Sequence, residues 1–416
     1  MIRRILMFAV AFVATVGLAQ EGLVSPYSYY GIGVDGARGT VENQSMGGLS
    51  ILGDSIHTNL LNPAGYGALR LTNFTLGLSH RHNALSTADE SGSVNSSTID
   101  YLSLAFPVSK RVGVGFGLMP FTSVDYKVIQ QEDDFYGLYR GEGGINQVFL
   151  TAGAEIFKGF RIGASAKYNF GRIRNQAIED AGGAYALREL NQSDLSGLLF
   201  DFGLQYEKRL ASDYFFTLSG NYTLEGAIES ENSRQFQTGQ FSRIENELIS
   251  VIEDRAVELA NTQVTTPARY GAGAGFGKKT KWFFGGEYNT IQASSFVGRP
   301  RGLADTDYRD ANQYRVGGYY IPRFNSISSY WGRVTYSAGL RYEETGLYVN
   351  NEGVDEFGIS FGLGLPLNRR TFSNINLLFE YGQRGTTASG LIQEDIFKFG
   401  LSLSLNAKWF QPFKFN

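Results

Sequence analysis

The chain has 416 residues, a formal net charge of -3 at pH 7 and no cysteine. The lack of cysteine excludes disulfides and a thiol-linked lipid anchor, and the absence of a basic stripe argues against nucleic acid as a partner. The 31 Phe, 24 Tyr and 52 Gly residues against only 9 Pro are typical of long strands with aromatic girdles.

The first 19 residues have the pattern of a secretory signal peptide. Arg3 and Arg4 precede an apolar run from 5 to 16, and small residues follow at Gly17 and Ala19. The run is about 12 residues long, whereas a helix needs roughly 20 apolar residues to span a bilayer. We therefore expect cleavage after Ala19 and export of the remaining chain.

The segment 20–68 precedes the first alternating stretch and is rich in Gly, Ser and Asn. Near its end lies the run Asn62-Pro63-Ala64. Proline fixes φ and disfavours helix at the residue before it, and an Asn side chain can bond the neighbouring backbone. The motif therefore predicts a sharp turn, with a direct part in gating as the alternative.

Fourteen segments from residue 69 onward alternate apolar and polar side chains. In the last of them, Phe397, Phe399 and Leu401 share one face, while Lys398 and polar residues take the other. One apolar and one polar face per strand is typical of a bilayer-spanning barrel. The segments are 69–83, 97–107, 111–128, 137–157, 160–176, 194–207, 213–227, 267–277, 281–292, 312–322, 333–348, 355–365, 373–384 and 394–410.

The predicted fold class is therefore all-β, a membrane-spanning antiparallel barrel of about 14 strands over residues 69–410, in the cell outer membrane. Both chain ends are expected in the periplasm, where residues 411–416 form a tail. Long polar connections at 84–96, 177–193, 228–266 and 293–311 are expected outside the cell.

Charged residues lie on the polar faces of these segments. A Lys or Arg that faces the lipid midplane costs about 2 to 4 kcal/mol, so we expect these side chains in the lumen. They are Lys167, Asp201, Glu287, Arg315, Arg341, Glu380 and Lys398. Because about 8 strands can fill a barrel with their own side chains and 16 to 18 leave a channel, the segment 20–68 is expected to serve as a plug.

The insertion 228–266 carries the pattern of an amphipathic helix. Ser242 followed by Glu245 forms a capping-box pair, and apolar residues then recur at helical spacing. The predicted apolar face contains Ile244, Leu248, Val251 and Ile252. Three roles stay open for it: a groove for a hydrophobic ligand, packing over the barrel mouth, or contact with a protein partner.

Histidine gives no indication of catalysis or of a metal site. His80 and His82 share a strand face without a third ligand, and neither they nor His57 has a nucleophile motif beside it. We therefore expect no enzyme activity, no catalytic residues, no metal and no cofactor.

Glycines recur at every second position in two segments, which distinguishes them from a nucleotide-binding loop. They occupy one strand face each, where missing side chains leave room in the lumen for a plug. They are Gly113, Gly115 and Gly117, then Gly271, Gly273, Gly275 and Gly277. The acidic run 132–134 is interpreted as a solvated loop, with a divalent ion shared with lipopolysaccharide as the alternative.

The run Met46-Gly47-Gly48, followed by Asp54 and then by Asn62-Pro63-Ala64 just before the first strand, resembles the N-terminal hatch of the FadL family. Residues 266–268, 281–288 and 294–296 resemble that family's pattern after a long extracellular loop. The resemblance implies a fourteen-stranded outer-membrane channel for long-chain fatty acids and other hydrophobic compounds, with the hatch as its gate.

Two functions follow as hypotheses. The first is passive uptake of a hydrophobic, fatty-acid-like small molecule, with outer-membrane lipid and lipopolysaccharide as surroundings. The second is a structural role, because barrels similar to FadL, such as those that resemble PorV of the type 9 secretion system, act as partners in a larger outer-membrane protein complex. On this second hypothesis the chain is a non-transporting accessory barrel of a secretion or assembly complex.

Overall fold

The structure is a computed structural model that describes residues 24–36, 39–296, 306–367 and 372–409. The predicted signal peptide and the tail 411–416 lie outside these ranges. Over the ranges described, no helix combines the length and the hydropathy that crossing a membrane requires.

The described chain forms a closed antiparallel barrel of 14 strand crossings, which confirms the predicted fold class. The barrel closes where β19 pairs with β2, from Ala407 opposite Thr72 to Gln393 opposite Ser86. The strands of the wall are β2 (Thr72–Ser86), β3 (Ser91–Pro107), β4 (Val112–Glu132), β5 (Phe135–Phe157), β6 (Phe160–Asp180), β7 (Ala186–Arg209), β8 (Tyr214–Thr223), β9 (Gly226–Ser242), β10 (Glu247–Glu258), β11 (Thr262–Thr266), β12 (Arg269–Lys278), β13 (Trp282–Ile291), β15 (Ala311–Tyr320), β16 (Thr335–Val349), β17 (Glu352–Pro366), β18 (Asn374–Arg384) and β19 (Gln393–Ala407).

Two crossings are interrupted. One consists of β8 followed by β9, and the next consists of β10, β11 and β12 in succession. The remaining elements are short: β1 (Val34–Asp35), β14 (Thr306–Tyr308), α2 (Val41–Gln44) and the 3-10 helices η1 (Pro26–Tyr29), η2 (Pro63–Ala68), η3 (Ala211–Asp213), η4 (Ala293–Ser295), η5 (Trp331–Arg333) and η6 (Ala388–Gly390).

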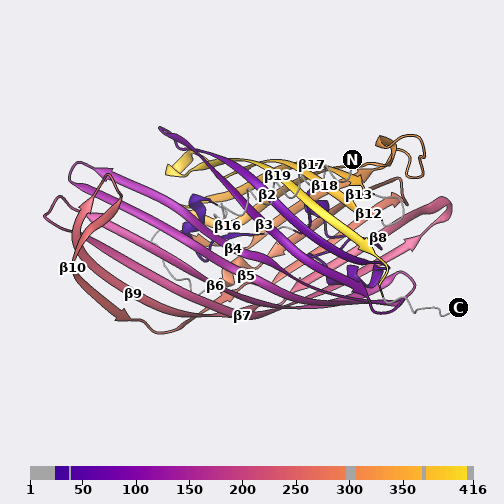
Figure 1. Cartoon of the computed structure of the whole chain (residues 1–416), viewed down its shortest axis with the longest axis horizontal. Helices are drawn as coiled ribbons and strands as arrows, with labels where there is room; N and C mark the ends of the chain where they lie inside the picture. Colours follow the sequence, from indigo (N-terminus) through magenta and orange to yellow (C-terminus); the bar gives the residue numbers. More distant parts are fainter. Residues whose placement is uncertain (1–23, 37–38, 297–305, 368–371, 410–416) are drawn as a thin grey trace.

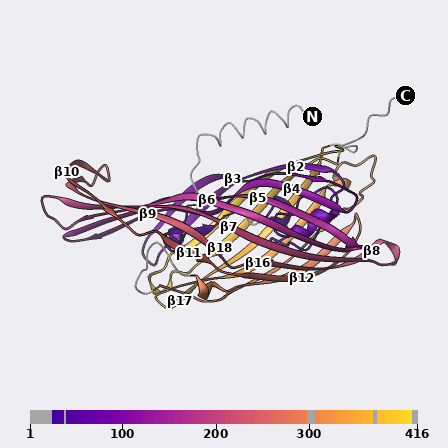
Figure 2. The same cartoon turned by 90° about the horizontal axis from the view of Figure 1, so that it is seen from below.

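The two ends of the barrel differ. At one end, where Thr72 and Ala407 lie, brief turns join β3 to β4 and β5 to β6, and we call it the short-turn end. At the other, the extended end, β4, β5, β6 and β7 of 21 to 24 residues and the β9–β10 hairpin project beyond the rest of the wall (Figures 1 and 2). By contrast, β12, β13 and β15 have only 10 residues each.

Much of what the sequence predicted as long polar connections is strand. The hairpin of β2 and β3 reaches Ser86 and Ser91, and that of β6 and β7 reaches Asp180 and Ala186. In these stretches polar residues occur on both faces between the apolar ones, so the apolar period is weak, although pairing still satisfies the backbone. The prediction of loops there was wrong.

The helix predicted within 228–266 is also absent, because Gly226–Ser242 and Glu247–Glu258 form the β9–β10 hairpin. The predicted cap bond exists, since Glu245 N donates to Ser242 Oγ at 3.2 Å, but it stabilises the hairpin turn. The insertion is dense in β-branched Ile and Val, which favour strand, and β9 supplies a pairing edge that periodicity cannot reveal.

Side chains alternate along the wall as predicted. On β7, Phe200 and Phe202 are 40% and 44% exposed, whereas Asp201 between them is 6% exposed. Leu78 and Ile375 are exceptions, because the period of two places them on the outward face and yet they are only 5% and 9% exposed. The apolar belt therefore faces outward and the charges face the lumen.

Part of the hydrophobic core lies between the wall and the segment 39–69, which is the later part of the predicted plug 20–68 and which we call the plug from here on. In one cluster, Met46, Leu49 and Ile51 of the plug pack against Phe215 and Phe283 of β8 and β13. In another, Val41 and Leu60 pack against wall residues of β3, β5 and β18. The plug thus supplies the apolar contacts that the polar lumen lacks.

Candidate functional site

The Asn62-Pro63-Ala64 motif sits inside the barrel, at the start of η2. Asn62 caps this helix by accepting a hydrogen bond from Ala64 N at 3.0 Å, and Pro63 occupies its first turn. The Asn62 amide also donates to Ser219 Oγ at 2.9 Å and to the Gly220 carbonyl at 3.1 Å, both on β8. The motif therefore makes the predicted turn and also fastens the plug to the wall.

Glycines of the wall let the plug backbone approach closely. A β-carbon on Gly163 of β6 would lie 2.3 Å from the Pro63 carbonyl carbon, and one on Gly339 of β16 would lie 2.0 Å from Gly47 N. Such separations exclude any side chain there. Because β6 and β16 lie far apart in the strand order, the wall holds the plug from several sides.

The glycines singled out in the sequence divide into two groups. Gly113 and Gly115 face Tyr66 of the plug, and Gly273 faces Ile51, as the plug hypothesis predicts. An added β-carbon on Gly275 would instead meet Phe283 of the neighbouring wall strand. The period of two thus identified the strand face that carries the glycines. Whether a glycine contacts the plug or a neighbouring wall residue depends on its height along the barrel axis.

All seven charges predicted in the lumen are mostly buried and form ion pairs. Lys167 pairs with Asp201, and Lys398 Nζ lies 3.2 Å from Asp100 Oδ2. Arg315 lies 3.9 Å from Glu287. Pairing is required here because an unpaired buried charge carries a large desolvation penalty.

The largest ionic network involves Arg341 and Arg384. The Arg341 guanidinium lies 2.6 Å from both Glu356 and Glu380, and Arg384 lies 2.7 Å from Glu356 and 3.4 Å from Glu394. These partners come from β16, β17, β18 and β19, so the network joins four neighbouring strands on the lumen side.

The plug takes part in the same networks. Glu287 Oε2 accepts hydrogen bonds from Ser50 N and Oγ at 2.7 and 2.8 Å, and Lys398 donates to Gln44 Oε1 at 2.7 Å. Arg315 donates to the Gly48 carbonyl at 3.1 Å. Charge-assisted bonds of this kind are stronger than neutral ones, so the lumen charges hold the plug as well as each other.

At the surface of the plug near the short-turn end, Asp54 and His57 form a pair. His57 Nδ1 lies 2.5 Å from Asp54 Oδ2, and His57 Nε2 lies 2.8 Å from the Asn374 side-chain amide. Burial lowers the pKa of His57, but the charge and hydrogen bond of Asp54 outweigh this and raise it to about 9. The pair therefore carries both charges at neutral pH.

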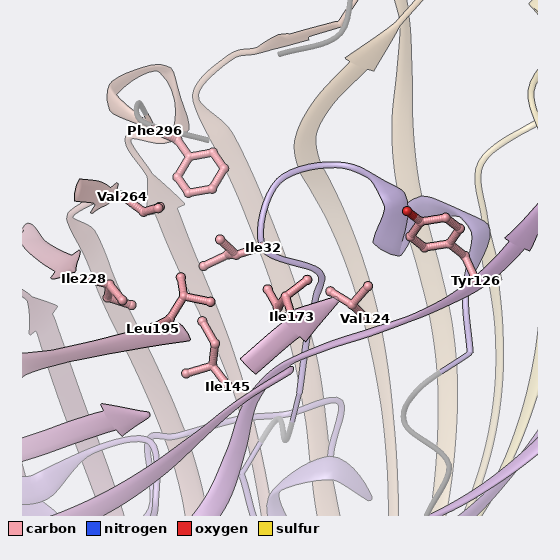
Figure 3. Packing of buried hydrophobic residues seen from close by; sticks show 9 residues of the cluster. All are labelled: Ile32, Val124, Tyr126, Ile145, Ile173, Leu195, Ile228, Val264 and Phe296. Atoms are coloured by element: carbon pink, nitrogen blue, oxygen red, sulfur yellow. The ribbon is translucent and has the colours of Figure 1, made fainter. Parts of the chain in front are cut away.

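A ring of apolar side chains surrounds Ile32 toward the extended end (Figure 3). The ring is formed by inward-facing residues of successive strands together with one residue after η4. They are Val124, Ile145, Ile173, Leu195, Ile228, Val264 and Phe296. Ile32, which is 6% exposed, fills the centre of the ring from the chain that precedes the plug.

Sequence reasoning missed this ring. The lumen-facing positions of these strands are mostly polar, but at the height of the ring they are apolar, as at Ile145 and Ile173. This change is the only signal of the ring in the sequence. That level becomes visible only when the strand register is known.

The wall is open between β3 and β4. These strands pair only from Leu102 to Pro107, and over the described residues Ser91–Tyr101 of β3 pair with β2 alone. Bulges at the same level of both strands account for the divergence, one at Asp100 and one at Phe121 beside Pro120, which has no N–H to donate.

The chain before the plug occupies the β4 side of this opening. Val34 and Asp35 of β1 pair with Ser123 and Thr122 of β4. Gly36 N donates to the Phe121 carbonyl at 2.8 Å in the same way. This segment therefore pairs with the first part of the β4 backbone that β3 leaves unpaired, from Phe121 to Ser123.

A cleft of about 1500 Å³ runs through the opening and includes residues of both faces of the wall. Its outer rim is apolar, with Ile99, Leu102 and Leu118 each 41% to 53% exposed. Its inner rim contains Arg81 and Thr122, whose Nε and Oγ1 atoms are buried and have no hydrogen-bond partner among the residues described.

The remaining candidates lie apart from the cleft. Among the residues of the predicted helix face, Ile244, Val251 and Ile252 are 95%, 45% and 59% exposed, and Leu248 packs beside the cluster of Tyr136 and its neighbours. They do not meet in one groove. His80 and His82 contact Ser97 and Asn95 on the outer face, and the described residues contain no cluster of three His, Cys, Asp or Glu able to hold a metal.

Comparison with known proteins gives a family and a fold. The model of a family described as BamG matches residues 1–416. The structure is similar to the toluene transporter TodX of Pseudomonas putida (14% identity, TM-score 0.61, 90% of this chain and 98% of that chain). It is also similar to the toluene transporter TbuX of Ralstonia pickettii (12%, 0.59, 91% and 99%) and to a FadL homologue of Pseudomonas aeruginosa (13%, 0.58, 90% and 98%).

These identities are low, so the structural neighbours show the fold, a FadL-like barrel. The name of the matching family, BamG, differs from the names of these structural neighbours. No curated protein matches this sequence.

Proposed function

This chain belongs to the BamG family, and we propose that it is an outer-membrane barrel through which hydrophobic small molecules pass by way of the opening between β3 and β4. In this proposal the extended end lies outside the cell and the short-turn end faces the periplasm. The observation that carries the proposal is the cleft of about 1500 Å³ that crosses the wall.

The fixed plug favours a lateral route over an axial one. Asn62, Ser50 and Gln44 bind wall residues on different strands, so an axial passage requires many buried hydrogen bonds to break together. Each buried polar group left unsatisfied costs about 1 to 3 kcal/mol. The opening already exists and requires only displacement of the segment around β1.

The chemistry of the cleft suits a hydrophobic ligand. Its outer rim of Ile99, Leu102 and Leu118 faces the bilayer, so an apolar molecule gains contacts as it leaves the lumen. The unpaired backbone of β3 is unfavourable in hydrocarbon. We therefore place the part of the opening nearest the extended end at the level of the lipid headgroups. Passage needs no cofactor, because differential affinity for the open and closed states is sufficient.

In the same proposal Ile32 and the segment around β1 form the gate. Ile32 occupies the apolar ring, and β1 covers the β4 edge, so a ligand that enters the ring displaces both. The Asn62-Pro63-Ala64 motif then serves as the fixed base of the plug, and gating occurs in the chain that precedes it.

Uptake of radiolabelled toluene and oleate by cells that carry single variants tests this route. Leu102→Asp places a charge on the outer rim, whereas Leu340→Asp places the same charge on the lipid-facing side of β16, where Leu340 is 49% exposed. We expect at least a tenfold loss of uptake for Leu102→Asp and little change for Leu340→Asp. Equal uptake by the wild type and a deletion strain, for both probes, contradicts the proposal.

A second candidate function is a non-transporting accessory barrel of an outer-membrane secretion or assembly complex. The projection of β4 to β7 and the β9–β10 hairpin beyond the barrel favours it, because passage through the opening does not need that surface. Purification in mild detergent followed by mass spectrometry separates the candidates. A stoichiometric partner without bound ligand supports the complex, and a lone barrel with bound hydrophobic compound supports the channel.

A further inference from the structure

The β10 strand is a free edge at the tip of the extended end. It pairs with β9 from Glu247 opposite Ser242 to Glu258 opposite Ser233, and the described residues contain no strand on its other edge. Its neighbour β9 is fixed on the far side by β7, from Ala186 to Ser196. A free edge presents a row of unpaired N–H and C=O groups that can accept another strand.

Both faces of β10 are exposed to solvent, in addition to its free edge. All residues from Ile249 to Ala256 are exposed. Within this stretch Ile249 and Ile252 are 62% and 59% exposed, and Val251 is 45% exposed. A soluble surface rarely groups aliphatic side chains in this way unless they contact something.

Ile249 and Ile252 each lie at a β-bulge of β10. The register between β10 and β9 skips Ile249 and Ile252, so neither has a partner residue on β9. Bulges re-aim side chains and are a common feature of functional sheet edges. The edge thus offers backbone groups for pairing and two apolar anchors beside them.

The charge around this edge is acidic. Glu245, Glu253 and Glu258 have no ion-pair or hydrogen-bond partner for their carboxylates within the described parts of the chain, and Arg255 is the sole basic residue of β10. By contrast, Glu247 pairs with Arg188, and Asp254 accepts hydrogen bonds from the neutral amides of Gln235 and Gln237. The uncompensated carboxylates therefore favour a positively charged partner.

The same charges disfavour a second copy of this chain. A second β10 strand would bring its own uncompensated Glu253 and Glu258 to this edge with only Arg255 to offset them, and like charges close together destabilise a sheet. The edge is therefore better suited to a different protein than to self-association.

From these observations we propose that β10 is a docking strand for an extended, basic and partly aliphatic segment of another extracellular protein. The segment adds to the sheet as a strand beyond β10, its aliphatic side chains contact Ile249 and Ile252, and its Lys or Arg residues face Glu253 and Glu258. This role goes beyond the passage of hydrophobic molecules and does not depend on it.

The first test uses the full-length protein in detergent micelles and a synthetic ten-residue peptide of alternating Val and Lys, with binding measured by fluorescence anisotropy. Two matched peptides serve as controls: one has Glu in place of Lys, and the other keeps Lys but carries N-methyl groups on alternate residues. We expect the basic peptide to bind at least tenfold more tightly than either control. Equal binding of the N-methylated peptide overturns the proposal, because charge alone then explains the affinity.

The second test locates the site on the chain. The double variant Glu253→Lys with Glu258→Lys is expected to weaken binding of the basic peptide at least tenfold. The control double variant Glu90→Lys with Glu352→Lys makes the same change of net charge at exposed positions beside the turns of two other hairpins, and we expect less than a twofold effect. Equal weakening in both double variants, or no binding by the wild type, also overturns the proposal.

Passage of hydrophobic molecules is measured separately in the same variants. Because β10 lies away from the opening, Glu253→Lys with Glu258→Lys is expected to leave uptake of toluene and oleate unchanged. Docking and uptake can therefore succeed or fail independently.

Discussion

The Asn62 carboxamide lies against Gly203 of β7, so closely that a β-carbon on Gly203 would be 2.1 Å from Asn62 Oδ1. On the other side, the Asn62 amide donates to Ser219 of β8. One plug residue therefore contacts two neighbouring wall strands. The space that its side chain occupies exists because Gly203 of β7 has no side chain. The plug and the wall are fitted to each other at this point.

Removal of the Asn62 side chain is expected to loosen the plug. Asn62→Ala deletes the cap of η2 and the bonds to Ser219 and Gly220, and a buried polar group left unsatisfied costs about 1 to 3 kcal/mol. Limited proteolysis of the plug in detergent measures the release. The control Asn95→Ala removes an exposed Asn on β3 and should leave the cleavage rate unchanged, so equal rates for both variants contradict the assignment.

Gly339 is expected to be intolerant of a side chain. Gly339→Ala would place a carbon 2.0 Å from Gly47 N and 2.2 Å from the Met46 carbonyl carbon, so the plug must shift. Gly286→Ala is the matched control, because the atom nearest to its β-carbon, the Arg315 carbonyl oxygen, would be 3.7 Å away. In planar bilayers we expect higher or noisier conductance for Gly339→Ala alone. Identical traces for the two variants are inconsistent with a plug held against β16.

The Lys398 and Asp100 pair is expected to be sensitive to loss of one partner. Lys398→Met leaves the buried Asp100 carboxylate without its cation, and breaking a buried pair costs about 3 to 5 kcal/mol. Thermal unfolding in detergent should show a clear drop in melting temperature. Addition of Asp100→Asn is expected to restore part of it, and a double variant less stable than Lys398→Met would argue against their coupling.

The Asp54 and His57 pair predicts how attachment of the plug depends on pH. Burial lowers the pKa of His57, but Asp54 outweighs it and raises the pKa to about 9, above an ordinary value of about 6.5. Its contribution is therefore complete below about pH 6.5 and is lost as the pH rises through about 9. For Asp54, burial raises the pKa, but His57 outweighs this and lowers it, so that contribution is lost only in acid.

Proteolysis of the plug across pH 5 to 10 measures this dependence. We expect faster cleavage above about pH 9 in the wild type and a flat profile over that range for His57→Gln. A wild-type profile without a rise at high pH contradicts the assignment.

Alternation along the strands was enough to predict the barrel and the lumen charges. Side chains of a strand repeat with a period of two, so the face of Lys167 or Asp201 is a local property that can be read without tertiary structure. The plug was predicted for a related reason, since a wide polar lumen needs a filler. The same local reasoning failed for β10, where the spacing of Ile244 and Leu248 also fits a helix and only the pairing with β9 decides for a strand.

The sequence by itself therefore determined which strand residues face outward, which face the lumen and that the chain forms a barrel, because these depend on periodicity. Only the tertiary structure decided where the wall opens, which side chains surround Ile32 and which edge is left free. Each of these depends on register: the bulges at Asp100 and Phe121 must lie at one level for β3 and β4 to diverge, and residues more than a hundred positions apart must meet for the ring to form. Register is set by contacts between distant strands, which no single stretch of sequence contains.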